Sequence, residues 1–311
     1  MSSTEEFLES FGSSTKTVYK TGIKVFEEFY RSAGLGDGID DFLDAVEEDM
    51  RRSRRKKQHV DRKVLRDFVK WLEKHGYSPK TIKAYVSAVQ SYANYYGIHI
   101  STRYIRIPEP IPISDKFPWT TDKVYEFVNL ISNQTVRTIA VIIFQSGLSV
   151  SDVLNLTWGK IKDEFNRKIV PLCLDVYRSK TKVHFMTFIG KWGFNVLKEY
   201  LKGKRLLSDD KLFDISQRLI NYHFQVATKK WIGEYRGFSP CRPHSLRVAF
   251  KTILSQAGAP YDIIEFFMGH KLPEHIRVYH SRTRDGWREI YAKYEPYLTP
   301  SQLSEKNKYQ F

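Results

Sequence analysis

The sequence has little of what marks several common classes of protein. It holds only two cysteines, Cys173 and Cys241, in 311 residues, too few for a disulfide framework or a cysteine-rich zinc site. It has no His-Glu-x-x-His motif, no signal peptide and no run of 18 consecutive apolar residues. We therefore expect an intracellular, cytoplasmic protein with no membrane anchor and no bound metal.

Acidic residues are scarce relative to basic ones. Lys and Arg total 50 against 35 Asp and Glu, which gives a net charge of +15. Residues 1–49 hold 12 acidic and 4 basic residues, whereas residues 50–108 hold 15 basic and 3 acidic ones. Such an excess favours a polyanionic partner, with nucleic acid as the first candidate. The run Arg-Arg-Ser-Arg-Arg-Lys-Lys at 51–57 is either a phosphate-contacting stripe or a solvated helix end.

Helical periodicity dominates the first third of the chain. Apolar residues recur at helical spacing in three segments, 15–30, 61–76 and 78–97. Ser78 is a suitable N-cap for the last of them, and Gly76 and Gly97 would each end a helix. We expect an all-α domain of four or five helices over residues 1–107. A proline-rich linker is expected at 108–118, since four prolines in 11 residues cannot continue a helix.

The rest of the chain, residues 119–311, mixes helices with strands. Helical patterns occupy the segments 122–132, 136–147, 149–158, 192–203, 244–256 and 260–269. Two β-like runs, 168–178 and 183–190, flank the polar turn Ser-Lys-Thr-Lys. The pattern predicts an α+β domain with a small antiparallel sheet on one side of a helical bundle.

The stretch Arg-Pro-His-Ser-Leu-Arg at 242–247 stands where a helix begins. His244 and Arg247 are three residues apart, so both would project from one face of the first turn, where backbone N–H groups also point outward. Such a place suits a phosphate. In an isolated pair of this kind, the histidine more often caps the helix and the arginine forms a surface ion pair. Other parts of the chain must therefore decide whether this pair binds a phosphate.

Two further elements follow in order. His270, preceded by Gly269, comes 23 residues after Arg247, and Tyr279 comes nine residues after His270. This ordered set resembles the tyrosine recombinase (phage integrase) family, and integrases of archaeal or viral type are the expected relatives. The resemblance covers nearly the whole chain. It implies a mainly α protein, with an N-terminal all-α core-binding domain of the SAM-like type and an α+β catalytic domain.

The resemblance also implies an activity and a role for each residue. The protein would be a site-specific DNA recombinase that cuts and rejoins double-stranded DNA through a 3′-phosphotyrosyl intermediate, as a homo-oligomer of two to four copies and without a cofactor. Tyr279 would attack the scissile phosphate and Arg247 would bind it. His244 would handle a proton beside it, and His270 would bind the phosphate or position the nucleophile. A planar, permanently charged guanidinium suits the charge that develops on the phosphoryl oxygens.

The general acid and the nucleophile both have rivals. Lys180 resembles the lysine that protonates the leaving oxygen, with Lys182 as the second choice. The C-terminal rivals of Tyr279 are Tyr291, Tyr294 and Tyr297. The spacing from the preceding histidine favours Tyr279.

One position departs from the family. Members usually carry a second phosphate-binding arginine in a segment like Thr-Gly-x-Arg-x-Ser-Glu, but here the segment 145–158 has Ser149 at that position. Losing such a donor typically costs about 3 kcal/mol of transition-state stabilisation. Three interpretations remain open. The protein is a weakened or vestigial relative that still binds DNA, or another arginine takes over the role, or Ser149 is an engineered substitution. In a strand, Arg178 would lie on the same face as Lys180, so Arg178 is the candidate for the recruited phosphate-binding arginine. The alternative is that Arg178 faces solvent and has no such role.

Two rival functions stay open at this point. One is a DNA-binding accessory protein with a vestigial site. The other is a type IB topoisomerase-like strand transferase, which shares the chemistry but needs no paired sites.

Overall fold

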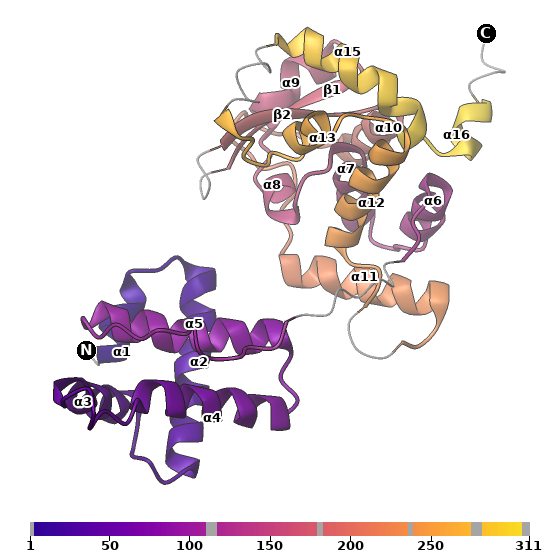
Figure 1. The fold of residues 1–311 in the computed structure, drawn as a ribbon. Coiled ribbons are helices and arrows are strands. Elements are labelled where there is room, and N and C mark those ends of the chain that lie inside the picture. The colour runs from indigo at the N-terminus through magenta and orange to yellow at the C-terminus, as the bar shows by residue number, and fades with distance from the viewer. Residues whose placement is uncertain (1–2, 110–116, 179–182, 236–238, 275–281, 307–311) are drawn as a thin grey trace. The chain divides into compact units, whose positions relative to one another are not determined.

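The computed structural model describes residues 3–109, 117–178, 183–235, 239–274 and 282–306 (Figure 1). The chain divides into two compact units, Met1–Ser114 and Asp115–Phe311, each with its own hydrophobic core. The division falls within the segment 108–118 for which a linker is expected. None of the helices described is long and apolar enough to cross a lipid bilayer.

The regular elements in the described part of the first unit are all helices. Its helices are α1 (Ser3–Glu9), α2 (Ser13–Ser32), α3 (Ile39–Arg51), α4 (Val60–Lys74) and α5 (Pro79–Tyr95). The ring of Phe26 lies 5.1 Å from the rings of both Phe42 and Phe68, so α2, α3 and α4 share one aromatic core. The Ser78 hydroxyl accepts a hydrogen bond from the backbone N–H of Thr81, which confirms the predicted N-cap of α5.

The basic run at 51–57 begins at the end of α3 and continues into the loop before α4. The buried carboxylate of Asp49 accepts hydrogen bonds from the backbone N–H groups of Gln58 (2.7 Å) and Val60 (3.3 Å). The bond from Gln58 is the main cause that holds the pKa of Asp49 below its ordinary value. One carboxylate thus ties the base of the loop, while the side chains of residues 54–57 are exposed.

The second unit combines helices with a two-stranded sheet. Its elements are α6 (Thr121–Asn129), α7 (Gln134–Ser146), α8 (Val150–Leu154), α9 (Trp158–Asn166), β1 (Leu172–Arg178), β2 (Val183–Ile189), α10 (Lys191–Leu201), α11 (Gln217–Ile232), α12 (Pro243–Gln256), α13 (Tyr261–Phe267), α15 (Arg284–Tyr294), the 3₁₀ helix η2 (Glu295–Leu298) and α16 (Ser301–Lys306). The strands pair antiparallel from Leu172 opposite Ile189 to Arg178 opposite Val183. The predicted fold class is confirmed.

The helix α7 forms the centre of this unit. Every residue from Thr138 to Ser146 is buried, and α7 packs against α10, α12 and β2. A central helix buried on all sides needs an apolar sequence all round, which explains the run Ile-Ala-Val-Ile-Ile-Phe. The chain leaves α7 at Gly147, whose positive φ of 68° ends the helix and turns the backbone toward α8.

The helices differ from the sequence-based expectation in length and in number. The helix predicted at 149–158 is wrong in length, because α8 ends at Leu154 and the backbone carbonyl of Leu156 instead accepts a hydrogen bond from the N–H of Leu212. The helices α9, α11, α15, η2 and α16 were not predicted. In α11 the buried residues Ile220, Phe224 and Ala227 follow helical spacing, a signal that was present in the sequence, whereas α9 buries only Ile161.

Candidate phosphate-binding site

The helix α12 begins as the Arg-Pro-His-Ser-Leu-Arg stretch predicts. Pro243 is its first residue and Arg242 its N-cap, whose backbone N–H donates to the Ser245 hydroxyl at 2.9 Å. His244 is exposed in the first turn. Arg247 is only 6% exposed, so this arginine is not a surface ion-pair residue.

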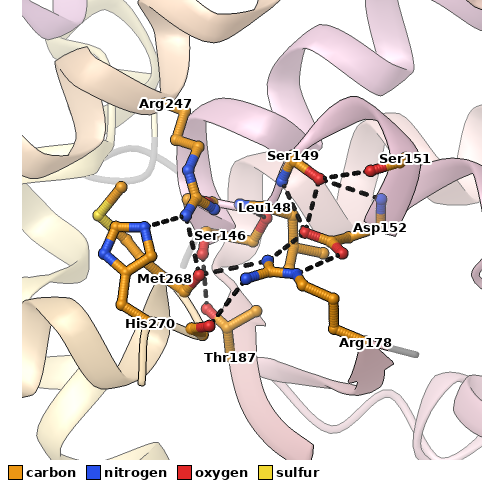
Figure 2. Close-up of polar contacts among 12 residues, drawn as sticks. Ser146, Leu148, Ser149, Ser151, Asp152, Arg178, Thr187, Arg247, Met268 and His270 are labelled. Carbon is orange, nitrogen blue, oxygen red and sulfur yellow. Dashed lines mark hydrogen bonds and ion pairs between the residues drawn. The ribbon is translucent and has the colours of Figure 1, made fainter. Parts of the chain in front are cut away.

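Three acceptors hold the Arg247 guanidinium (Figure 2). Its Nη1 donates to the carbonyl of Gly147, and its Nη2 donates to the carbonyl of Met268 (2.9 Å) and to Nε2 of His270 (2.7 Å). A guanidinium has five N–H donors. Within the described part of the chain, its Nε–H and one Nη1–H therefore have no acceptor. They remain available to an anion.

The charge balance around Arg247 also favours an anion. Burial lowers the pKa of Arg247 to about 10 and the nearby charge of Arg178 acts in the same direction, while Asp152 and Glu265 oppose them. Arg247 stays protonated at neutral pH. Lys251, which pairs with Glu265, adds a third cation to the two arginines. Against the carboxylates of Asp152 and Glu265, the cluster therefore has one positive charge in excess.

His270 lies between Arg247 and a carboxylate. Its Nδ1 is 2.5 Å from Oε2 of Glu265, and its Nε2 faces Arg247. Because a guanidinium can only donate, Nε2 must be the acceptor and the ring proton must be on Nδ1. The structure thus brings together Arg247 and His270, two members of the ordered set of motifs, in a direct contact that the sequence did not predict.

Ser149 serves as the N-cap of α8. Its hydroxyl accepts from the backbone N–H of Asp152 (3.3 Å) and donates to Asp152 Oδ2 (2.7 Å). Asp152 is 5% exposed and is also bound by Arg178, whose Nε donates to Oδ1 at 3.0 Å and whose Nη2 donates to Oδ2. Burial opposes ionisation of Asp152, but Arg178 and Ser149 outweigh it and keep its pKa below the ordinary value.

Arg178 lies beside Arg247 rather than in solvent. Its Nη1 donates to the carbonyl of Gly269 (2.7 Å), and its side chain is 19% exposed. The carbonyl oxygen of Met268 accepts from Nη2 of both arginines, at 2.9 Å from Arg247 and 3.4 Å from Arg178, as Figure 2 shows. The solvent-facing alternative for Arg178 is therefore wrong. One backbone carbonyl bridges the two guanidinium groups.

A hollow of about 190 Å³ adjoins this cluster. Ser149, Gln217, His244 and Arg247 are among the residues that line it. The hollow thus collects the start of α12, the cap of α8 and the first residue of α11. Gln217 was not anticipated, and the sequence carries no motif that would have singled it out. The described residues include no cluster of three or more His, Cys, Asp or Glu side chains that could hold a metal ion.

Comparison with known proteins covers the part of the chain that holds this cluster. The sequence pattern described as the phage integrase family matches residues 120–285, slightly more than half of the chain. The chain belongs to the tyrosine recombinase (phage integrase) family. The matched segment contains Ser149, Arg178, Arg247 and His270, so the cluster of Figure 2 lies within the family's shared domain.

Curated relatives extend the match over most of the chain. The tyrosine recombinase XerA of Pyrococcus horikoshii is 26% identical over 230 residues, which cover 73% of this chain and 78% of XerA. The tyrosine recombinase XerC of Oceanobacillus iheyensis is 24% identical over 302 residues, which cover 91% of this chain and 90% of XerC.

Solved structures of tyrosine recombinases share the fold. The XerH site-specific recombinase, in a pre-cleavage complex with its difH substrate, matches with a TM-score of 0.59 at 16% identity, over 93% of this chain and 84% of XerH. The Tn1549 transposon integrase, in complex with transposon right end DNA, matches with a TM-score of 0.52 at 15% identity, over 86% of this chain and 97% of that chain.

Three residues expected in the site, Tyr279, Lys180 and Lys182, lie outside the described residues. A rival nucleophile is disfavoured on physical grounds. Tyr291 is fully buried, its hydroxyl donates to the carbonyl of Gln145 at 2.8 Å, and burial raises its pKa well above the ordinary value. A phenol in that state is a poor nucleophile and is inaccessible to DNA.

Proposed function

We propose that this protein is a site-specific DNA recombinase that cuts and rejoins duplex DNA through a 3′-phosphotyrosyl intermediate. The observation that carries the proposal is the buried Arg247, which keeps two N–H donors without a protein acceptor among the described residues and lines a hollow together with His244. Its position within the family's shared domain supports the same conclusion.

The proposed reaction is a transesterification with two proton transfers. The phenolic oxygen of Tyr279 attacks phosphorus, and the bond from phosphorus to the 5′ oxygen breaks. His244 accepts the phenolic proton and Lys180 donates a proton to the departing 5′ oxygen. The 5′ hydroxyl of another strand then attacks phosphorus and gives its proton to Lys180, while the bond from phosphorus to the Tyr279 oxygen breaks and His244 returns a proton to the phenol. The energy of the phosphodiester is conserved and no cofactor is consumed.

We further propose that Arg178 provides the second positive charge in place of the family arginine that Ser149 replaces. The carbonyl of Met268, which accepts from both guanidinium groups, supports this role. Arg178 also has one N–H donor more than its described acceptors use. A competing interpretation is a vestigial site, because Asp152 already neutralises much of the Arg178 charge.

Double-stranded DNA is the proposed partner, bound by a homo-oligomer of two to four copies in the cell. The solved structure of the Tn1549 integrase is a complex with DNA, and that of XerH is a complex with its difH substrate, which supports the DNA partner. In the basic run at 51–57, Arg51 and Arg52 pair with acidic residues one helical turn earlier, so we expect Arg54 and Arg55 to bind phosphate more strongly. Replacing Arg54 and Arg55 by glutamine should reduce the slope of log affinity against log salt by about 0.9 for each phosphate that is no longer neutralised. An unchanged slope would move the footprint elsewhere.

Trapping on a nicked suicide substrate tests the activity. The full-length protein should form a denaturation-resistant DNA adduct that is absent from the Tyr279→Phe variant. An adduct that persists in this variant, or that maps to Tyr294 or Tyr297, would show that another tyrosine attacks. DNA binding without any adduct would favour the accessory protein, and relaxation of supercoiled DNA without paired sites would favour the topoisomerase-like enzyme.

Two substitutions decide the role of Arg178. If Arg178 serves the phosphate, Arg178→Ala should abolish the adduct and leave DNA affinity largely intact, while Ser149→Arg should add little. Normal cleavage by Arg178→Ala would refute the role. A silent protein that Ser149→Arg activates would establish the vestigial interpretation instead.

A further inference from the structure

A buried carboxylate behind His270 has no part in the chemistry described so far. Glu265, near the end of α13, is 7% exposed. Its Oε2 accepts a hydrogen bond from Nδ1 of His270 at 2.5 Å, and its Oε1 accepts one from Nζ of Lys251 at 2.5 Å. Burial opposes its ionisation, but the bonds from Lys251 and His270 outweigh burial and keep its pKa below the ordinary value.

The two oxygens of Glu265 therefore serve two donors, one from α12 and one from the turn that follows α13. Lys251 lies one helical turn after Arg247 on α12, so the same helix supplies the phosphate-binding guanidinium and the cation that fixes Glu265. The four side chains form a continuous line of hydrogen bonds from Lys251 through Glu265 and His270 to Arg247.

We infer that Glu265 is a positioning residue for the strand-transfer site: it holds the His270 ring proton on Nδ1, so that Nε2 accepts from Arg247 and fixes the guanidinium. Lys251 keeps Glu265 ionised and in place. This inference rests on the proposed function, but the state of the histidine ring is measurable whether or not the protein cleaves DNA.

The tautomer matters because Arg247 and His270 cannot both donate to each other. With the ring proton on Nδ1, Nε2 offers a lone pair and the guanidinium is held by three acceptors. With the proton on Nε2, two donors would oppose each other and the guanidinium would lose one of these acceptors. A displaced guanidinium aims its remaining N–H donors poorly at a phosphate.

Nitrogen NMR of the full-length protein, labelled with ¹⁵N-histidine, tests the tautomer directly. The His270 signals are assigned by their loss in His270→Gln. We expect one protonated nitrogen, Nδ1, and one unprotonated nitrogen, Nε2, at neutral pH. A ring protonated on Nε2 alone, or on both nitrogens, would overturn the inference.

Glutamine at position 265 provides a sharper test, because an amide has one oxygen for two donors. In Glu265→Gln the charged Lys251 should take that oxygen, the amide N–H should face Nδ1, and the His270 proton should move to Nε2. The first-turnover cleavage rate should fall about tenfold to a hundredfold, with DNA affinity within about twofold of the original.

The double variant Lys251→Met with Glu265→Gln separates positioning from general stabilisation. Without Lys251 the amide oxygen is free to accept from Nδ1, so the original tautomer should return and the cleavage rate should recover by at least about fivefold. Lys251 is 39% exposed, so water can reach the amide nitrogen in its place. A purely structural role of Glu265 predicts the opposite, a double variant worse than Glu265→Gln.

Glu234→Gln is the matched control. Glu234 pairs with Lys229 at 2.9 Å, and its side chain is 81% exposed. We expect no change in tautomer, cleavage or affinity. If Glu265→Gln keeps the original tautomer and cleaves at the original rate, the inference is wrong. If the unaltered protein forms no adduct but shows the expected tautomer and its shift, the proposed function fails while the positioning of His270 stands.

Discussion

Replacing Arg178 by alanine leaves a buried carboxylate without its cation. Asp152 is 5% exposed and accepts two N–H bonds from Arg178. Breaking a buried ion pair on one side typically costs about 3–5 kcal/mol. Two hydrogen bonds from Ser149, at 2.7 and 3.1 Å, remain to stabilise the carboxylate. We therefore expect a decrease of about 2–4 kcal/mol in the free energy of unfolding at pH 7.

The decrease should depend on pH with a definite sign. In the native protein the pKa of Asp152 is lowered, so its ionised form contributes stability above the unfolded pKa of about 4, and this contribution is lost as pH falls through the folded value. In Arg178→Ala, burial is no longer outweighed by the arginine, and protonation at low pH relieves the buried charge. The difference between the two proteins should therefore be largest near pH 7 and should shrink toward about pH 4.

Urea unfolding at the two pH values, followed by tryptophan fluorescence, measures this difference. Five of the six tryptophans lie in the second unit, so the signal reports mainly on the unit that is altered. Adding Asp152→Asn to Arg178→Ala should recover part of the stability, because it removes the stranded charge. Alanine in place of the exposed Arg205 is the control and should change the free energy by less than about 0.5 kcal/mol. A decrease below about 1 kcal/mol at pH 7, or one that is equal at both pH values, would refute the reasoning.

Three further predictions follow from single interactions. In Gly269→Ala, the new Cβ would lie 2.3 Å from the Phe185 ring at a φ of +65°, so urea unfolding should show a destabilisation of more than about 2 kcal/mol; an unchanged midpoint would contradict the packing. Tyr291→Phe removes the buried bond to Gln145 and should cost about 1–2 kcal/mol with an unchanged adduct yield, whereas a folded variant without adduct would implicate this tyrosine. Asp49→Ala should speed hydrogen exchange of the backbone amides of Gln58 and Val60, which the Asp49 carboxylate binds. In the unaltered protein these bonds should weaken as pH falls below about 4, because the lowered pKa of Asp49 keeps the carboxylate ionised above that range. Exchange that Asp49→Ala leaves unchanged would show that other groups hold the loop.

The local signals in the sequence were informative because they depend on short-range physics. A proline at the first turn, a capping serine and the spacing of apolar residues act within one or two turns of a helix, so the start of α12 and the cap of α5 were predictable. The spacing from Arg247 to His270 also proved informative, because it spans the rest of α12, the helix α13 and a turn that brings His270 back to Arg247. The helix α9 was missed because it buries a single residue and carries almost no periodic pattern.

The family, the mixed fold and the membership of Arg247 and His270 in one ordered set of motifs can be read from the amino-acid sequence, since each follows from motifs and periodicities along the chain. The groups that surround this pair are set by tertiary packing. Arg178 and Arg247 share the carbonyl of Met268, and Glu265 binds Lys251, because the end of β1, the helix α12 and the helix α13 with its following turn come together in the fold. No local sequence pattern encodes these contacts, because the contacts depend on how the buried faces of separate elements fit together.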